Sequence, residues 1–192
     1  GFSYFTGLPS DFPRDQGYRN LFACNAGDNV ERLYMATFGL PGRILYWDGD
    51  TFQNTSSQGL STSILNLQQG EVDLGFRAST CFKGRVWVSP AGSALDVDAA
   101  LHPIVFMNPD PANGAAWEEI VDVTDPASHP LADPDNIGIF QMEAMGNYLW
   151  FTTLNRTTGL ELWRGDGSDC LAPWEGDGQC NITWAKVIDN GG

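Results

Sequence analysis

The sequence is poor in basic residues and has no long apolar run. Lysine is nearly absent, and the 10 lysine and arginine residues stand against 24 acidic ones, which gives a formal net charge of −14. Binding to DNA or RNA needs a basic footprint, so this composition argues against a nucleic-acid partner. No apolar stretch approaches the roughly 20 residues of a membrane-spanning helix, so we expect no membrane span.

Histidines and catalytic motifs are scarce as well. His102 and His129 each precede a proline, and neither belongs to a recognisable Ser-His-Asp or Cys-His arrangement. Carboxylate pairs such as Asp48 with Asp50 recur, as they do by chance in an acidic chain. The residues therefore favour a non-enzymatic role, and we assign no catalytic residue.

Glycine and proline, in contrast, are plentiful, with 22 and 11 residues, and aromatic residues make up 12% of the chain. Together with short alternating apolar runs, this composition favours many short strands and turns over helices. The stretches most compatible with a helix, Ser61–Gln69 and Asp96–Leu101, are short.

One unit occurs three times along the chain. Its first strand begins with a glycine that precedes an aromatic or aliphatic residue, at Gly17, Gly75 and Gly138. A polar turn follows, then a second strand with an aromatic residue in its second place, a third strand, and a fourth strand that starts with an aromatic residue. The second strands are expected at Leu33–Thr37, Val86–Pro90 and Leu149–Thr153, the third at Arg43–Trp47, Pro103–Met107 and Leu160–Arg164, and the fourth from Phe52, Trp117 and Trp184.

Four short antiparallel strands in each unit of roughly 60 residues are typical of β-propeller blades. We therefore expect an all-β single domain over residues 1–192, with blades at about 17–57, 75–123 and 138–190. A β-sandwich with coincidental tryptophan spacing is the alternative. Known propellers use about four to eight blades, so three blades need completion, by further blades of a six- to eight-bladed propeller or by another chain. Variable links between blades commonly carry binding.

The third unit carries the fullest motif, which runs through Leu149-Trp150, Gly159–Arg164, Asp166-Gly167 and Thr183-Trp184. This pattern resembles the repeats of secreted or periplasmic β-propellers. Its Asp-Gly turn before Thr-Trp resembles the Asp-box of sialidase-type propellers, although here a long insertion separates the two dipeptides. The resemblance implies a turn device, in which the aspartate caps backbone N–H groups and the tryptophan packs between sheets. It implies a fold and no activity.

The four cysteines, Cys24, Cys81, Cys170 and Cys180, fit no zinc-binding spacing. Cys170 and Cys180 bracket the insertion of the third unit, and a disulfide between them would close that loop. Cys24 and Cys81 fall on the first strands of neighbouring units, where a bridge is geometrically feasible. Four buried free thiols are the alternative. A disulfide favours an oxidising compartment.

Three N-glycosylation sequons, which begin at Asn54, Asn155 and Asn181, lie in or beside predicted turns. Together with the even number of cysteines, they favour an exported protein that is secreted, extracellular or on the cell surface.

Two clusters of aspartates offer hard oxygen ligands in turns, Asp166 with Asp169 and Asp133 with Asp135. Such ligands suit Ca²⁺, although neither cluster matches an EF-hand loop. Solvated turns without a bound cation are the alternative, and we expect no other cofactor.

We therefore expect an extracellular binding or assembly module that presents loops to a protein or glycan partner. One alternative is a sialidase-like or other glycoside-active propeller, in which Arg19 and Arg77, repeated at the start of the first strands, would converge with two carboxylates. The other alternative is a structural subunit of an extracellular assembly, whose open sheet edge is covered by a neighbouring chain.

Overall fold

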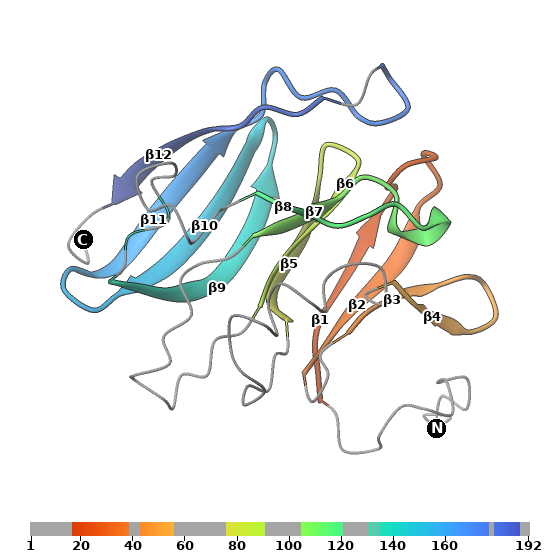
Figure 1. The fold of residues 1–192 in the computed structure, drawn as a ribbon, viewed down its shortest axis with the longest axis horizontal. Helices are drawn as coiled ribbons and strands as arrows, with labels where there is room; N and C mark the ends of the chain where they lie inside the picture. Colours follow the sequence, from red (N-terminus) through yellow and green to blue (C-terminus); the bar gives the residue numbers. More distant parts are fainter. Residues whose placement is uncertain are drawn as a thin grey trace.

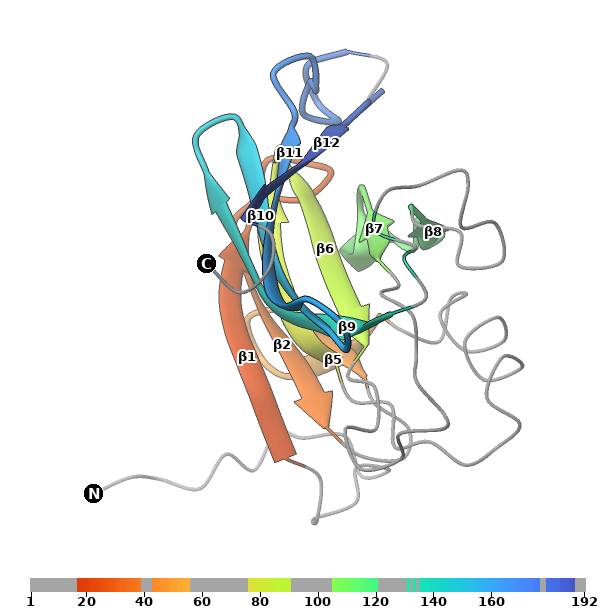
Figure 2. The same cartoon turned by 90° about the vertical axis from the view of Figure 1, so that its left-hand side faces the viewer.

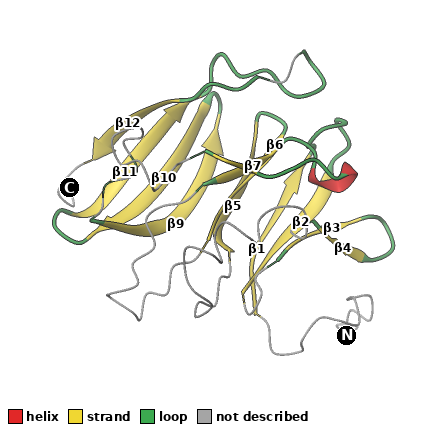
Figure 3. Cartoon of the chain, viewed as in Figure 1, coloured by secondary structure: helices red, strands yellow, loops and turns green. Residues whose placement is uncertain are grey.

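The computed structural model describes residues 17–38, 43–55, 76–90, 105–120, 131, 133, 135–176 and 179–188. In these ranges the chain is all-β, and its strands form three four-stranded antiparallel sheets that follow one another along the sequence (Figure 1). One short 3-10 helix, η1 (Pro111–Asn113), is the helical element of the described residues (Figure 3). The predictions of an all-β chain and of four-stranded units are confirmed.

Each sheet is a meander, because its strands pair in chain order. The first sheet consists of β1 (Gly17–Cys24), β2 (Arg32–Phe38), β3 (Ile44–Trp47) and β4 (Phe52–Asn54). The second sheet consists of β5 (Phe76–Phe82), β6 (Arg85–Pro90), β7 (Phe106–Asn108) and β8 (Glu118–Glu119). The third sheet consists of β9 (Asn136–Met145), β10 (Tyr148–Asn155), β11 (Gly159–Asp166) and β12 (Thr183–Ile188).

The tight turn between β5 and β6 explains where these two strands end. Lys83 and Gly84 have φ angles of 52° and 67°, so both central residues lie in the left-handed region. A two-residue turn of this kind matches the twist of its flanking strands. The turn between β9 and β10 begins with Gly146, whose φ is 61°. Both turns lie at the positions that the sequence predicts.

Both faces of the second sheet are covered by a neighbouring sheet. Val86 and Val88 of β6 pack with Tyr34 of the first sheet. Trp87, which lies between them, points the other way and packs with Leu149 and Phe151 of the third sheet. Successive side chains of a strand point to opposite faces, so a strand that is buried on both faces reads as a continuous apolar run. These two apolar clusters lie between the sheets, and a third cluster on the first sheet, of Met35, Leu45 and Phe52, completes the core of the described residues.

The first strand of each sheet lies beside the first strand of the next. β5 contacts β1 on one side and β9 on the other, and the three sheets succeed one another across the molecule (Figure 1). The view turned by 90° shows the third sheet in front of the other two (Figure 2). No helix within the described ranges is long and apolar enough to cross a membrane.

Several features that were predicted from the sequence lie outside the described residues. These are both histidines, the two helix-compatible stretches, and most of the links at 59–74 and 122–136.

Candidate functional site

Each first strand carries a bulge at the same place. The pairing register shifts around Arg19 in β1, around Arg77 in β5 and around Phe140 in β9. A bulge inserts one extra residue into a strand and re-aims its side chain, and bulges are common beside binding sites. Because β1, β5 and β9 are adjacent, the three bulged residues occupy equivalent positions on neighbouring strands. We call Arg19, Arg77 and Phe140 the bulge row.

The bulge row brings two positive charges and an aromatic ring together. The guanidinium carbon of Arg77 lies 3.9 Å from the centroid of the Phe140 ring, which is a cation–π geometry. Burial lowers the pKa of Arg77, and the nearby positive charge of Arg19 lowers it further. Beside the row, Asn20 Nδ2 donates a hydrogen bond to the carbonyl oxygen of Arg77 at 3.1 Å and so ties β1 to β5.

Two neighbouring guanidinium groups attract an anion. The planar fork of arginine binds carboxylate, sulfate or phosphate oxygens through paired hydrogen bonds. Exposed side chains border the row, among them Tyr18 and Leu21 on β1 and Gln141 on β9. Burial raises the pKa of Tyr18, so its hydroxyl stays neutral and can donate a hydrogen bond. The bulge row therefore suits a ligand in which an acidic group is attached to an apolar or ring-shaped moiety.

Two disulfides join the same pairs of cysteines that we considered from the sequence. Cys24 of β1 is bonded to Cys81 of β5, and this bridge links the first sheet to the second. Cys170 is bonded to Cys180 and closes the loop between β11 and β12. Disulfides of this kind are typical of proteins that fold in an oxidising environment.

The loop that the Cys170–Cys180 disulfide closes packs against the second sheet. Arg85, at the start of β6, donates from Nη1 to the carbonyl oxygen of Leu171 at 2.7 Å. A Cβ atom added at Gly84 would lie 2.5 Å from the ring of Trp174, so only glycine fits under this tryptophan. The sequence marked this loop as the distinctive part of the third unit. The part of the loop that carries Leu171 and Trp174 contacts the second sheet and so connects it to the third.

The three sequons differ in their surroundings. Asn181 is exposed, and Asn54 is partly exposed at the end of β4. Asn155 is only 2% exposed, and its Nδ2 donates to Asp133 and Asn136. A glycan on this nitrogen would displace both acceptors from a buried site. In the folded chain the Asn155 amide thus belongs to a buried hydrogen-bond network, and glycosylation of the three sequons stays a prediction.

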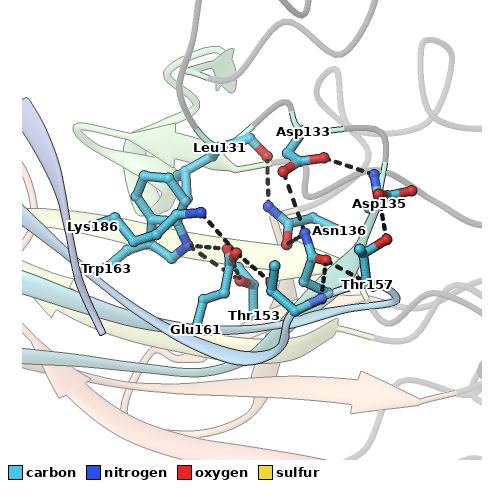
Figure 4. A network of polar contacts seen from close by, with 11 residues as sticks. Leu131, Asp133, Asp135, Asn136, Thr153, Thr157, Glu161, Trp163 and Lys186 are labelled. Atoms are coloured by element: carbon cyan, nitrogen blue, oxygen red, sulfur yellow. Dashed lines mark hydrogen bonds and ion pairs between the residues drawn. The ribbon is translucent and has the colours of Figure 1, made fainter. Parts of the chain in front are cut away.

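Asp133 and Asp135 belong to the same network as Asn155 (Figure 4). Asp133 Oδ1 accepts from the backbone N–H of Asp135 at 2.9 Å, and Asp135 Oδ2 accepts from the hydroxyl of Thr157 at 2.6 Å. Asn155 Oδ1 accepts from the backbone N–H groups of Thr157 and Thr158. Protein donors thus occupy these oxygens, and they fix the entry to β9 against the turn between β10 and β11.

The second half of this network surrounds a fully buried carboxylate, Glu161 (Figure 4). Lys186 Nζ lies 2.7 Å from Glu161 Oε1, and Thr158 also donates to this oxygen. The indole nitrogen of Trp163 and the hydroxyl of Thr153 donate to Oε2 at 3.0 and 3.3 Å. Burial opposes ionisation of Glu161, but these donors outweigh it, and the pKa of Glu161 lies below its usual value.

Asp166 and Asp169 lie in the turn that follows β11. Asp166 Oδ1 accepts from the hydroxyl and the backbone N–H of Ser168, and these bonds lower the pKa of Asp166. Asp48 makes the corresponding contacts in the first sheet, where its Oδ1 accepts from the N–H groups of Asp50 and Thr51. Among the residues that the structure describes, no three His, Cys, Asp or Glu side chains form a group that could hold a metal ion. The aspartates that we considered for Ca²⁺ make turn and network hydrogen bonds, and a cation at either place stays a prediction.

Two parts of this arrangement were missed at the level of sequence. Arg19 and Arg77 were noted as repeated, but their bulges and the contact of Arg77 with Phe140 were not expected. Glu161 was taken as part of a motif, whereas it is the buried centre of a polar network. The burial of Glu161 could have been predicted from strand alternation, because Glu161 shares a face of β11 with the buried Trp163.

A comparison with protein-family models found no match, and searches of curated proteins and of solved structures found none either.

Proposed function

We propose that these three sheets are consecutive blades of an exported β-propeller, and that the protein is a binding module for a protein or glycan partner that bears acidic groups. The observation that carries this proposal is the bulge row. A bulge at the same position of three adjacent first strands sets Arg19, Arg77 and Phe140 along the inner edge of the sheets. In a propeller this edge faces the central channel.

The succession of the sheets supports the propeller arrangement. Each sheet packs face to face on the next, and the first strands stay side by side, as blades do around an axis. The two disulfides support export, because such bonds persist in oxidising compartments. The exposed sequon at Asn181 is compatible with passage through a secretory pathway.

The glycoside-active alternative requires a pair of facing carboxylates near the guanidinium groups. In the described ranges, the Arg77 side chain contacts the ring of Phe140 and has the like charge of Arg19 near it. This combination favours recognition of an acid over cleavage of a glycosidic bond, so binding is the function that the geometry supports best.

The proposal is tested with an array that carries uronate, sulfated and sialylated oligosaccharides, acidic peptides, and neutral counterparts of each. We expect retention of the acidic probes and a loss of roughly tenfold or more in affinity for Arg77→Gln, because a charge-assisted pair is removed. The matched control is Arg156→Gln, which removes the same charge from an exposed turn. Equal retention of neutral probes, or equal affinity of the two variants, contradicts the proposal.

A further inference from the structure

Arg77 of the bulge row is fixed at both of its ends by neighbouring sheets. Asn20 Nδ2 of β1 donates to the backbone carbonyl oxygen of Arg77 at 3.1 Å, and the guanidinium carbon lies 3.9 Å from the ring centroid of Phe140 on β9. β5 lies between β1 and β9, so the two restraints come from opposite sides (Figure 1). A side chain that is fixed before binding loses less conformational entropy when a ligand arrives.

The hydrogen-bond donors of the Arg77 head are left for a ligand. Within the described ranges, its guanidinium group lies over the Phe140 ring and donates no hydrogen bond to the protein. Burial lowers the pKa of Arg77 and the charge of Arg19 lowers it further, so a bound anion stabilises the charged form of Arg77. Because one face of the guanidinium group is covered by the ring, ligand oxygens bind in its plane, where its N–H groups point.

The charges of the bulge row favour a single, isolated acidic group. The row has two cations, Arg19 and Arg77, and its third place is taken by the uncharged Phe140. The chain as a whole has a formal charge of −14, which repels a polyanion at long range. A heavily sulfated glycan or a run of acidic residues therefore gains little beyond the two guanidinium groups, and the rest of the chain repels it.

Asn20 adds a hydrogen-bond acceptor beside these donors. Its Nδ2 is engaged by the carbonyl oxygen of Arg77, whereas its Oδ1 accepts no hydrogen bond from the described residues. Arginine only donates and an amide oxygen only accepts, so a ligand that satisfies both groups has a hydroxyl near its acid. A uronic acid, which is a sugar ring with a carboxylate and nearby hydroxyls, has this combination. The acidic side chains of a peptide have a carboxylate and no neighbouring hydroxyl.

We propose that the bulge row binds a glycan through one uronic acid residue, whose carboxylate lies on Arg77 and Arg19 and whose hydroxyl donates to Asn20 Oδ1. Phe140 is a positioning residue, because it holds the head of Arg77 and does not contact the carboxylate. This inference rests on the proposed binding of acidic groups. It narrows the partner from an acidic protein or glycan to a glycan that carries an isolated uronate among neutral sugars.

Isothermal titration calorimetry of the 192-residue chain tests the choice of ligand. The probes are a disaccharide of glucuronic acid and a neutral sugar, the methyl ester of this disaccharide, cyclohexanecarboxylate, a heparin-derived oligosaccharide and an oligoglutamate peptide. We expect the disaccharide to bind most tightly, and its uncharged ester to lose roughly tenfold or more in affinity. Phe140→Leu should weaken the disaccharide roughly two- to fivefold, since a cation–π contact is lost. Phe140→Tyr keeps a ring at this place and should retain the affinity.

Asn20→Ala separates recognition of a hydroxyl from a structural effect. We expect this variant to lose roughly threefold or more in affinity for the disaccharide. Its affinity for cyclohexanecarboxylate should stay unchanged, because this probe has the ring and the acid but no hydroxyl. Equal losses for the two probes would show that Asn20 only supports the strands, and would overturn the inference.

The same titrations distinguish this inference from the function on which it rests. Tighter binding of the heparin oligosaccharide or of the oligoglutamate peptide than of the disaccharide, with a loss in Arg77→Gln, overturns the uronate and leaves the proposed acidic ligand in place. Unchanged affinity of Phe140→Leu for the disaccharide likewise overturns the positioning role of Phe140. If no acidic probe binds, or if Arg77→Gln binds every probe as the wild type does, the proposed function fails and the inference fails with it.

Discussion

The disulfide between the first and second sheets offers the sharpest test of what stabilises this fold. Cys24 and Cys81 are separated by 57 residues in sequence, whereas Cys170 and Cys180 are separated by 10. On the chain-entropy model, closing the longer loop contributes about 4 kcal/mol to the free energy of unfolding and closing the shorter one about 3 kcal/mol. Replacing Cys24 and Cys81 together by alanine should therefore cost more than replacing Cys170 and Cys180.

The measurement is urea and thermal unfolding of the two doubly substituted proteins beside the wild type. For a chain of this size, about 4 kcal/mol corresponds to a fall in Tm of roughly 8–16 °C. The Cys170–Cys180 variant is the matched control, because it also loses one bridge. An equal or larger loss of stability in that control would refute the reasoning, since it would show that packing around the β11–β12 loop matters more than loop closure.

Two further predictions concern buried groups. Glu161→Gln should lower the free energy of unfolding by about 2 kcal/mol at neutral pH, because the charge-assisted bonds from Lys186 and Trp163 are weakened. The pKa of Glu161 is lower in the folded state, so its contribution is present above the pKa of an unfolded glutamate and is lost as the pH falls through the folded pKa. The free energy of unfolding, measured at several values from pH 7 to pH 3, should thus fall less steeply with decreasing pH in the variant than in the wild type. Equal pH dependence of the two proteins would contradict this account. Gly84→Ala should destabilise the chain more than Gly146→Ala, because both have positive φ but only the first meets a side chain, that of Trp174. Thermal unfolding of the two variants decides the point, and equal losses would exclude the contact with Trp174 as the cause.

Much of the fold was predictable because two local signals agree in every unit. Alternating apolar residues mark the strands, and glycine or asparagine marks the hairpin turns, as at Lys83-Gly84 and Gly146-Asn147. The continuous run Val86–Val88 is a strand that is buried on both faces. Its alternation of side chains already encodes which residues face each neighbouring sheet.

The candidate site was less predictable, for physical reasons. A bulge depends on the pairing register between two strands, and that register cannot be determined from a single sequence. The contact between Arg77 and Phe140 joins two strands of different sheets, so it arises only when the sheets pack. Asn155 is a further case, because the sequon is a local pattern and only tertiary packing reveals that its amide is buried.

The bulges also have a consequence for how such a protein can diversify. Ordinary strand positions alternate between two packed faces, so a substitution there disturbs the core. A bulged residue is additional to that alternation, so its side chain does not have to fit either packed face. Arginine at positions 19 and 77 and phenylalanine at position 140 show that chemically different residues occupy it with the same backbone. In the binding role proposed above, recognition would be separable from folding, because variation at one position per sheet would change the ligand preference and leave the core unchanged.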